Sequence, residues 1–292
     1  MGAGYFDELI SFETKRLCVV TGIPGHGKSE FVDFLVERLN ILYGWKAAMF
    51  SPENEPKRNH IAKLMEKLTG ARFPQDGQHG PDTITFEQYA QAAAYMEDNF
   101  FFIAPERNDI GTILEKARFL VRRKGIRILV LDPYNRIENE DTSGYETQYI
   151  SGVLDRLTKF AQKHDVLIFL VAHPTKMQKS KDGRPTRPSL YDIAGSANFF
   201  NKADYGLSVF RDHAQDKVDV EVEKVKFRQM GHTGRAEFNY NMRNGRYSQF
   251  KAGFPAFEDN SNHIDQLNAQ NASERLQNAK FDIYPTDEEA PF

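Results

Sequence analysis

Short apolar runs alternate with segments of helical periodicity along most of the chain. Continuous apolar runs of this length are typical of strands that are buried on both faces. They cover residues 17–21, 47–51, 100–104, 128–131 and 166–171. Between them, apolar residues recur every three or four positions, as on one face of a helix. These helical segments cover residues 31–42, 59–68, 86–94, 110–124 and 150–160. Strands that alternate with helices predict an α/β fold, with a mostly parallel central sheet and helices on both faces.

After residue 205 the pattern changes to strands without helices between them. The expected strands cover residues 206–210, 218–227, 236–240 and 247–250. We interpret them as an antiparallel C-terminal extension of the sheet. In the longest of them, the apolar positions change parity between Val222 and Val225. A β-bulge near Glu223 or Lys224 would reconcile the two halves.

The chain divides into three parts on this pattern. Residues 1–16 form a short N-terminal segment, and residues 17–254 form the predicted core. Residues 255–292 are polar, rich in Asn and Gln, and acidic at the end. We expect this last part to be a flexible tail without a core of its own, with a short helix around residues 273–280.

Composition narrows the classes of protein that remain. With 292 residues and a formal net charge of −3, the chain fits one large α/β domain, and any contact with nucleic acid must come from a local basic patch. Its one cysteine, Cys18, cannot form an internal disulfide, which suits a reducing compartment. No stretch is long and apolar enough for a membrane span or a signal peptide. We therefore expect no membrane partner and a cytoplasmic location.

A phosphate-binding motif joins the first strand to the first long helix. Residues 22–29 read GIPGHGKS and fit the pattern G-x-x-x-x-G-K-[ST]. The nucleotide-binding residues of this motif are Gly22, Pro24, Gly25, His26, Gly27, Lys28 and Ser29. Backbone N–H groups of such a loop turn toward the phosphates, Lys28 would reach the β- and γ-phosphates, and Ser29 would hold Mg²⁺. The chain is expected to bind ATP or another nucleoside triphosphate with Mg²⁺.

Polar residues follow three further strands at the edge where open α/β sheets bind ligands. Asp132 follows the run at 128–131 and is the expected second Mg²⁺ contact. Glu53 follows the second strand and is a candidate general base for the water that attacks the γ-phosphate. His173 follows the run at 166–171 and could contact the γ-phosphate. The alternatives are a solvated loop carboxylate for Glu53 and a simple strand cap for His173.

Two basic groups lie beyond these strand ends. The loop at residues 174–188 contains Lys176, Lys179, Lys181 and Arg184, which could grip a nucleic-acid backbone or be merely solvated. Lys226 and Arg228 are two residues apart on a predicted strand and would therefore project from one face. Arginine suits the stabilisation of a transferring phosphoryl group. Spacing alone favours an ordinary charged surface for this pair.

With these residues in place, the chain resembles the motor domain of DnaB-family replicative helicases, in particular the branch of Twinkle and the phage primase–helicases. The resemblance covers about residues 5–250 and is carried by an ordered set of motifs: VVTGIPGHGKSE, FSPENEP, LVLDPYNRI, VAHPTK, LYDIAGSANFFNKAD and VEKVKFRQMGHTG. It implies a RecA-like ATPase core. It also implies a DNA-stimulated ATPase that moves 5′-to-3′ on single-stranded DNA as a hexameric ring, with ATP sites between subunits. Primase and other replisome proteins are implied partners, and residues 1–16 would be a remnant of the family's linker. The implied compartment is the cytoplasm of a bacterial or phage-infected cell, with the mitochondrial matrix as the less favoured alternative.

The resemblance also implies roles for individual residues. Glu53 matches the catalytic glutamate and Asp132 the metal-binding aspartate, while His173 matches a phosphate sensor. Asn201 falls where the phage enzymes have a second polar sensor, a glutamine. The remaining matches are Lys226 and Arg228 for the pair supplied to the neighbouring subunit, Arg211 and Tyr240 for residues beside the nucleotide base, and the basic loop with Gly195 and Ser196 for DNA-binding loops.

Two other functions are compatible with the same residues. A RecA-like recombinase or recombination mediator would form filaments and exchange strands. A non-hydrolysing loader or regulator would bind nucleotide as a switch. The SPENEP and KVKFR segments favour the helicase branch, and Glu53 beside a complete phosphate-binding loop argues against an inactive ATPase.

Overall fold

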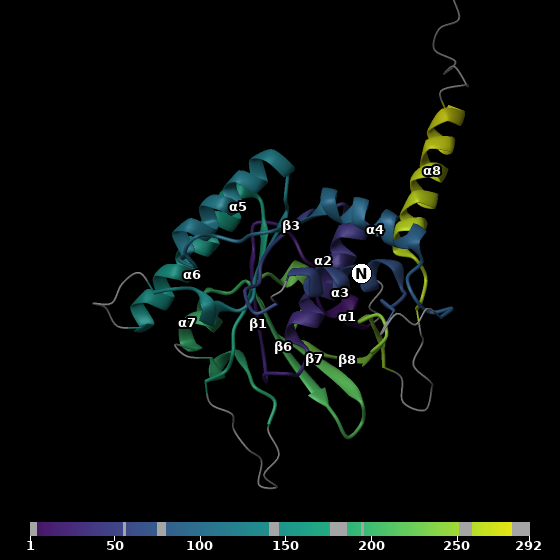
Figure 1. The fold of residues 1–292 in the computed structure, drawn as a ribbon. Helices are drawn as coiled ribbons and strands as arrows, with labels where there is room; N and C mark the ends of the chain where they lie inside the picture. The colour runs from purple at the N-terminus through teal and green to yellow at the C-terminus, as the bar shows by residue number, and fades with distance from the viewer. Residues whose placement is uncertain are drawn as a thin grey trace, which may run out of the picture.

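In a computed structural model, the described part of the chain has a mixed sheet of nine strands at its centre (Figure 1). The structure describes residues 5–54, 57–74, 80–139, 146–175, 186–193, 196–250 and 259–281. The sheet order is β3-β2-β4-β5-β1-β6-β7-β8-β9. The strands are β1 (Leu17–Gly22), β2 (Ala47–Phe50), β3 (Phe100–Phe102), β4 (Ile128–Leu131), β5 (Leu167–Val171), β6 (Tyr205–Asp212), β7 (Lys217–Val225), β8 (Gly234–Tyr240) and β9 (Tyr247–Gln249).

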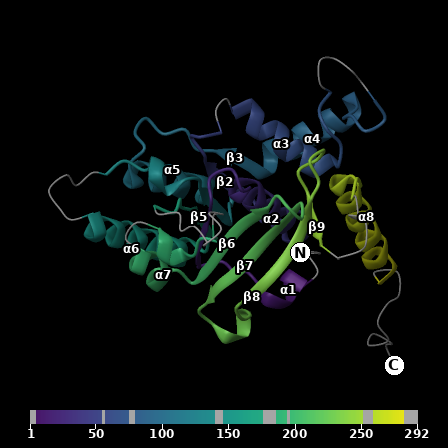
Figure 2. The same cartoon turned by 90° about the horizontal axis from the view of Figure 1, so that it is seen from below.

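The first six strands of this order are parallel, and β7, β8 and β9 are added antiparallel. Figure 2 shows β7 and β8 beside β6, with α1 packed beneath β8. The expected α/β architecture with an antiparallel C-terminal extension is therefore confirmed. Each parallel strand ends at the same edge of the sheet, which brings together the loops that follow β1, β2, β4 and β5.

Helices cover both faces of the sheet and close two hydrophobic cores. The helices are α1 (Tyr5–Leu9), α2 (Lys28–Tyr43), α3 (Lys57–Thr69), α4 (Phe86–Asn99), α5 (Ile110–Lys124), α6 (Glu146–His164), α7 (Ser196–Lys202) and α8 (His263–Phe281). Alternate residues of β1 show the division: Cys18 and Val20 join the core under α1 to α4, while Leu17 and Val19 join the core under α5 to α7. Among the described residues, no helix is both long and apolar enough to cross a membrane.

The predicted bulge lies where the parity change placed it. Gly206 of β6 pairs with Lys224, but the next residue, Leu207, pairs with Val222. Glu223 is therefore the extra residue of β7. Its carboxylate turns back to accept a hydrogen bond from the backbone N–H of Leu190 (2.9 Å).

The face predicted for the helical segment at residues 86–94 is wrong. The periodicity there predicts that Phe86 and Tyr89 are buried, but Phe86 is 87% exposed and Tyr89 45% exposed. Instead, α4 is buried through Ala92 and Met96. The alanines of this helix can be buried on either face. Packing against α3 and α8 therefore decides which face is buried.

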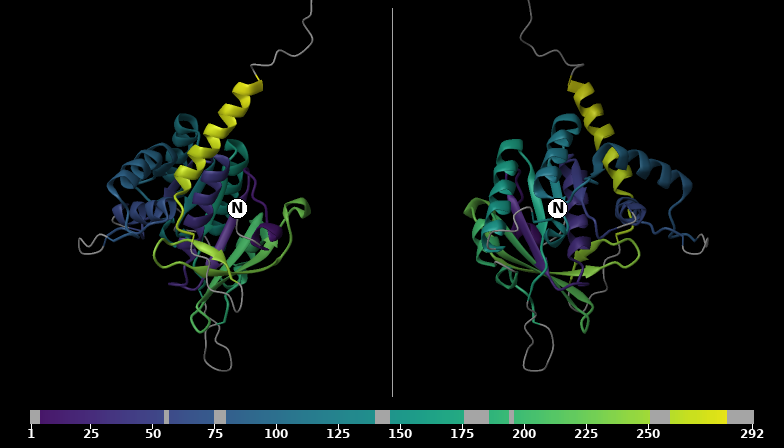
Figure 3. Two further views of the ribbon diagram at one scale, coloured as in Figure 1. Left: turned by 90° about the vertical axis from the view of Figure 1, so that its right-hand side faces the viewer. Right: turned by 60° about the vertical axis from the view of Figure 1, so that its left-hand side comes forward.

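The C-terminal helix is longer than predicted and begins inside the core. It starts at His263 instead of near residue 273, and Ile264 is only 3% exposed. Beyond this anchored start, α8 projects from the body of the protein (Figure 3). Most of the described turns of α8 face solvent, so its composition is polar. For this reason the sequence did not indicate that the first turn is buried.

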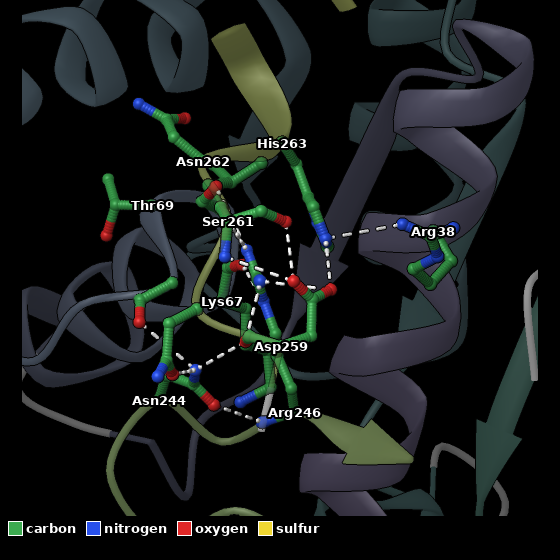
Figure 4. A network of polar contacts seen from close by, with 12 residues as sticks. Arg38, Lys67, Thr69, Asn244, Arg246, Asp259, Ser261, Asn262 and His263 are labelled. Carbon is green, nitrogen blue, oxygen red and sulfur yellow. Dashed lines mark hydrogen bonds and ion pairs between the residues drawn. The ribbon is translucent and has the colours of Figure 1, made fainter. Parts of the chain in front are cut away.

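Buried polar residues hold the start of α8 against α2 and α3 (Figure 4). His263 Nδ1 lies 2.6 Å from Glu37 Oε1, and its Nε2 lies 3.2 Å from Asp259 Oδ2. Arg246, only 3% exposed, donates hydrogen bonds to the carbonyl oxygens of Lys67 (2.7 Å) and Ser261 (2.8 Å). The helix that carries the phosphate-binding loop is thus tied to the C-terminal segment.

Candidate functional site

The phosphate-binding loop lies between β1 and α2, near the middle of the sheet. Strand β1 pairs with β5 on one side and β6 on the other. Gly27 has φ 88° and, being a glycine, caps α2 without a side-chain hydrogen bond of its own. The first N–H groups of α2 therefore remain available to an anion, at the positive end of the helix dipole. Pro24 and Gly25 lie exposed on the outside of the loop.

Lys28 is folded into this loop and almost completely buried. Its ammonium group donates hydrogen bonds to the carbonyl oxygens of Gly22 (2.9 Å) and Ile23 (3.1 Å). Burial lowers the pKa of Lys28 to about 8, although the nearby carboxylates of Asp132 and Glu53 act in the opposite direction. The charge is held by neutral carbonyl groups, which a phosphate can replace.

Asp132 and Ser29 meet beside the loop. Asp132 follows β4, is 6% exposed, and accepts a hydrogen bond from the Ser29 hydroxyl. Burial and the neighbouring Asp33 raise the pKa of Asp132 to about 6. A hydroxyl and a carboxylate are hard oxygen ligands of the kind Mg²⁺ prefers, and Mg²⁺ usually takes few protein ligands because it keeps waters and substrate phosphates. The residues therefore fit the expected ion.

A buried ion pair that the sequence pattern does not predict lies behind this position. Asp33 on α2 and His60 on α3 are both nearly buried, and His60 Nε2 is 3.0 Å from each carboxylate oxygen of Asp33. Burial lowers the pKa of His60, but the charge of Asp33 and the hydrogen bond to it raise the pKa above its ordinary value. Asp33 stands four residues after Ser29 on one helix, so its direction could have been read from the sequence. Its partner could not.

Glu53, His173 and Arg136 come together where β2, β4 and β5 end. Arg136 Nε donates a hydrogen bond to Glu53 Oε1 (2.9 Å), and His173 Nε2 lies 3.7 Å from Glu53 Oε2. Burial and the charge of Lys28 lower the pKa of His173, while Glu53 raises it by less. Strand order predicts Glu53 and His173 at one edge, and the structure brings them together. Arg136 was not predicted, although it belongs to the LVLDPYNRI segment.

A second group of residues lines the outer side of the loop. The backbone N–H of Arg211 donates a hydrogen bond to His26 Nδ1 (3.0 Å). The guanidinium carbon of Arg211 lies 5.7 Å from the ring centroid of Tyr240, within cation–π range. Tyr247, which was not predicted, packs 5.0 Å from Tyr240 and donates a weak hydrogen bond to the Gly27 carbonyl (3.4 Å). Arg211 and Tyr240 are thus neighbours of the loop.

The prediction that Lys226 and Arg228 share one strand face is wrong. Strand β7 ends at Val225, Lys226 follows it, and Arg228 begins the short 3₁₀ turn η3 (Arg228–Met230). The Lys226 ammonium binds Asp204 Oδ1 (2.9 Å), and Asp204 Oδ2 accepts a hydrogen bond from the N–H of Leu17, the first residue of β1. The pair therefore lies at the amino end of β1, opposite the phosphate-binding loop.

The other predicted residues are not assembled with this site in the described part of the chain. The carbonyl of Asn201 accepts a hydrogen bond from Lys224 (3.1 Å), also toward the amino ends of the strands. Ser196 begins α7, and its side chain is not among those described. The predicted DNA-binding residues Lys176, Lys179, Lys181, Arg184 and Gly195 lie outside the described residues.

A phosphate-binding loop at the centre of a mostly parallel sheet, with an aspartate at the end of β4 beside Ser29, defines a P-loop nucleotide-binding protein. Residues 2–251 match the family model of the DnaB-like helicase C terminal domain. The Arabidopsis thaliana Twinkle homolog protein, chloroplastic/mitochondrial, is 37% identical over 252 residues, which are 83% of this chain and 35% of the relative. The chain therefore belongs to the DnaB-like helicase C-terminal domain family, and it spans about a third of the length of this curated relative.

Solved structures agree on the fold. One of them, an ATPase domain, has a TM-score of 0.72 and 18% identity, and the match covers 86% of this chain and 90% of that one. A DnaB-like replicative helicase, solved in a study of its interactions with primase, also has a TM-score of 0.72 and 18% identity, covering 86% of this chain and 63% of that one. The RecA-like core implied by the sequence resemblance is confirmed by these matches.

Proposed function

We propose that this chain is the motor domain of an ATP-dependent replicative DNA helicase. The observation that carries the proposal is the convergence of Lys28, Ser29, Glu53, Asp132 and His173 at the carboxyl ends of four neighbouring strands, in a member of the DnaB-like family. This is the set of groups that hydrolysis of a nucleoside triphosphate requires: a phosphate cradle, a metal position and a base. Family membership favours this function over a recombinase or a non-hydrolysing loader.

Each group has a role in the proposed reaction. Lys28 and the first N–H groups of α2 bind the phosphates. Ser29 and Asp132 would hold Mg²⁺, which neutralises charge on the phosphates when bound. Glu53 accepts a proton from the attacking water, and His173 contacts the γ-phosphate. Arg211 and Tyr240, beside the outer wall of the loop, flank the base of ATP or another nucleoside triphosphate.

The ring and its DNA contacts are part of the proposal. Lys226 and Arg228 lie far from the loop of their own chain, which supports a role at the nucleotide of a neighbouring subunit in a hexameric ring. The loop with Lys176, Lys179, Lys181 and Arg184, and the segment with Gly195 and Ser196, would contact single-stranded DNA. The motor would move 5′-to-3′, with Asn201 as a second sensor.

The similar proteins also suggest a further partner and a cell compartment for this chain. One solved structure concerns a helicase and its interactions with primase, so a primase is a reasonable partner here. The relative from Arabidopsis is named chloroplastic/mitochondrial, so an organelle stands beside the bacterial or phage-infected cytoplasm as a candidate compartment.

The test is ATP hydrolysis measured with and without single-stranded DNA. We expect DNA to stimulate the wild-type protein and Glu53→Gln to lower the rate by roughly 10²–10⁴-fold, because an amide cannot accept the proton. Glu115→Gln is the matched control, since Glu115 lies exposed on α5, away from the site. Wild-type hydrolysis that is indifferent to DNA contradicts the motor function. An active Glu53→Gln variant contradicts the role of Glu53.

A further inference from the structure

The turn after β4 forms hydrogen bonds with both residues that we place at the γ-phosphate, Glu53 and His173. This 3₁₀ turn, η1 (Tyr134–Arg136), follows directly on Asp132 and Pro133. Asn135 Oδ1 accepts a hydrogen bond from the backbone N–H of His173 (3.2 Å). Arg136 Nε donates one to Glu53 Oε1 (2.9 Å). Two consecutive side chains therefore connect the ends of β2 and β5 to the strand that carries Asp132.

The two oxygens of Glu53 have different surroundings. Oε1 is bound by Arg136, whereas Oε2 lies 3.7 Å from His173 Nε2, which is beyond hydrogen-bond length. This hydrogen bond from the rigid, planar guanidinium group restricts the directions that the Glu53 carboxylate can take. Lys28 is a further charged group close enough to interact with Glu53. Among the described residues, the carboxylate oxygen without a hydrogen bond of ordinary length is Oε2, which faces His173.

The ion pair has little to do with the stability of the fold. The side chain of Arg136 is 60% exposed and that of Glu53 41% exposed. Ion pairs as exposed as this one contribute little to the free energy of unfolding. A residue that orients a general base, by contrast, affects the rate strongly, because small misplacements of reacting groups are costly.

We propose that Arg136 is a positioning residue for Glu53, which holds Oε1 so that Oε2 can accept the proton of the attacking water. The inference rests on the proposed ATPase function. In the step that it serves, the water proton moves to Oε2 and the water oxygen bonds to the γ-phosphorus. The bond from that phosphorus to the β–γ bridging oxygen breaks, giving nucleoside diphosphate and phosphate. Arg136 touches Glu53 and acts through it.

The first test is the steady-state kinetics of Arg136→Ala with single-stranded DNA present. We expect kcat to fall by up to about 10²-fold, because the base loses its orientation, while KM for ATP and the melting temperature stay at the wild-type values. Arg136→Lys should recover part of the loss, since an ammonium group can bind Oε1 but is less rigid than the planar guanidinium group. Arg118→Ala is the matched control: Arg118 is 49% exposed and pairs with Glu115 on the outside of α5.

The second test is a double-mutant cycle. Once Glu53→Gln has removed the base, adding Arg136→Ala should cause no further loss of kcat, because the two residues act as one unit. A further loss in that background, or a raised KM, would mean that Arg136 acts on the nucleotide itself and would overturn the inference. If the wild type is active and Arg136→Ala is equally active, the role of Arg136 is contradicted, whereas the proposed ATPase function is not. A wild type without DNA-stimulated hydrolysis contradicts the proposed function.

Discussion

At the scale of single residues, the loop depends on glycine for different reasons at two of its positions. Gly22 has φ 154°, and a Cβ there would lie 2.3 Å from the Val209 carbonyl oxygen on β6. Gly25 has φ 79°, and a Cβ there would meet no described atom within 4 Å. We expect Gly22→Ala to lower the free energy of unfolding by about 3 kcal/mol or more, because a backbone clash adds to strain. Gly25→Ala should lower it by only about 1–2 kcal/mol.

Urea-induced unfolding of the two variants measures this difference. Both carry the same added methyl group in the same loop, so Gly25→Ala serves as the control for Gly22→Ala. Equal losses would mean that β6 moves aside for the new side chain, and the steric argument would be wrong.

The sequence predicts the contacts of a site residue only where the order of the strands determines its neighbours. Ser29 meets Asp132, and Glu53 meets His173, because the carboxyl ends of parallel strands share one edge. The ion pair of Asp33 with His60 depends on how α3 crosses α2, which apolar periodicity does not specify. The contact from Arg136 depends on the direction of one side chain in a short turn.

At the scale of elements, the anchor of α8 depends on the protonation of one histidine. Burial lowers the pKa of His263, but hydrogen bonds to Asp259 and Glu37 raise it by more, so the pKa lies above its ordinary value of 6.5. Arg38 and Arg246 are the other charged groups near the ring. Because the anchored state favours the charged imidazolium, its stabilisation is complete below 6.5 and is lost as the pH rises through the raised pKa.

Amide hydrogen exchange in the first turn of α8 can detect this loss. After correction for intrinsic exchange, we expect faster exchange at about pH 9 than at about pH 6. His263→Asn should exchange fast at both, because asparagine cannot carry the charge. His232→Asn, at an exposed position before β8, should keep the wild-type pH dependence. Equal protection of the wild type at both pH values contradicts a role for His263 in the anchor.

The elements themselves show where local pattern is sufficient. The helix at Ile110–Lys124 and the strand at Ile128–Leu131 have the bounds that the sequence predicted, because both are strongly patterned and end at clear signals. The bulge at Glu223 could be located because a change of parity within one strand calls for an inserted residue. The anchor of α8 could not, because it consists of buried charged and polar residues whose partners lie on α2 and before β9.

At the scale of the whole molecule, the sheet separates two sets of proposed catalytic residues. Lys28, Glu53 and His173 lie at the carboxyl ends of the strands, whereas Lys226 is bound to Asp204 at the amino end of β1. β1 has six residues, so its two ends are about 17 Å apart, which is beyond the reach of a single side chain. If Lys226 and Arg228 act on a nucleotide, that nucleotide is held by another copy of the chain.

This separation makes a prediction about mixed assemblies. Glu53→Gln and Arg228→Ala should each be nearly inactive alone, the second by roughly 10³–10⁵-fold if Arg228 stabilises the transition state. When the two are mixed in equal amounts and allowed to exchange subunits, roughly a quarter of the heterologous interfaces combine an intact Glu53 with an intact Arg228. Hydrolysis should therefore reappear in the mixture. If both residues served the nucleotide of their own chain, every site would still lack one of them and the mixture would stay inactive. Mixing Glu53→Gln with Lys28→Ala, whose defects lie on the same half of the site, is the control that should show no recovery under either arrangement.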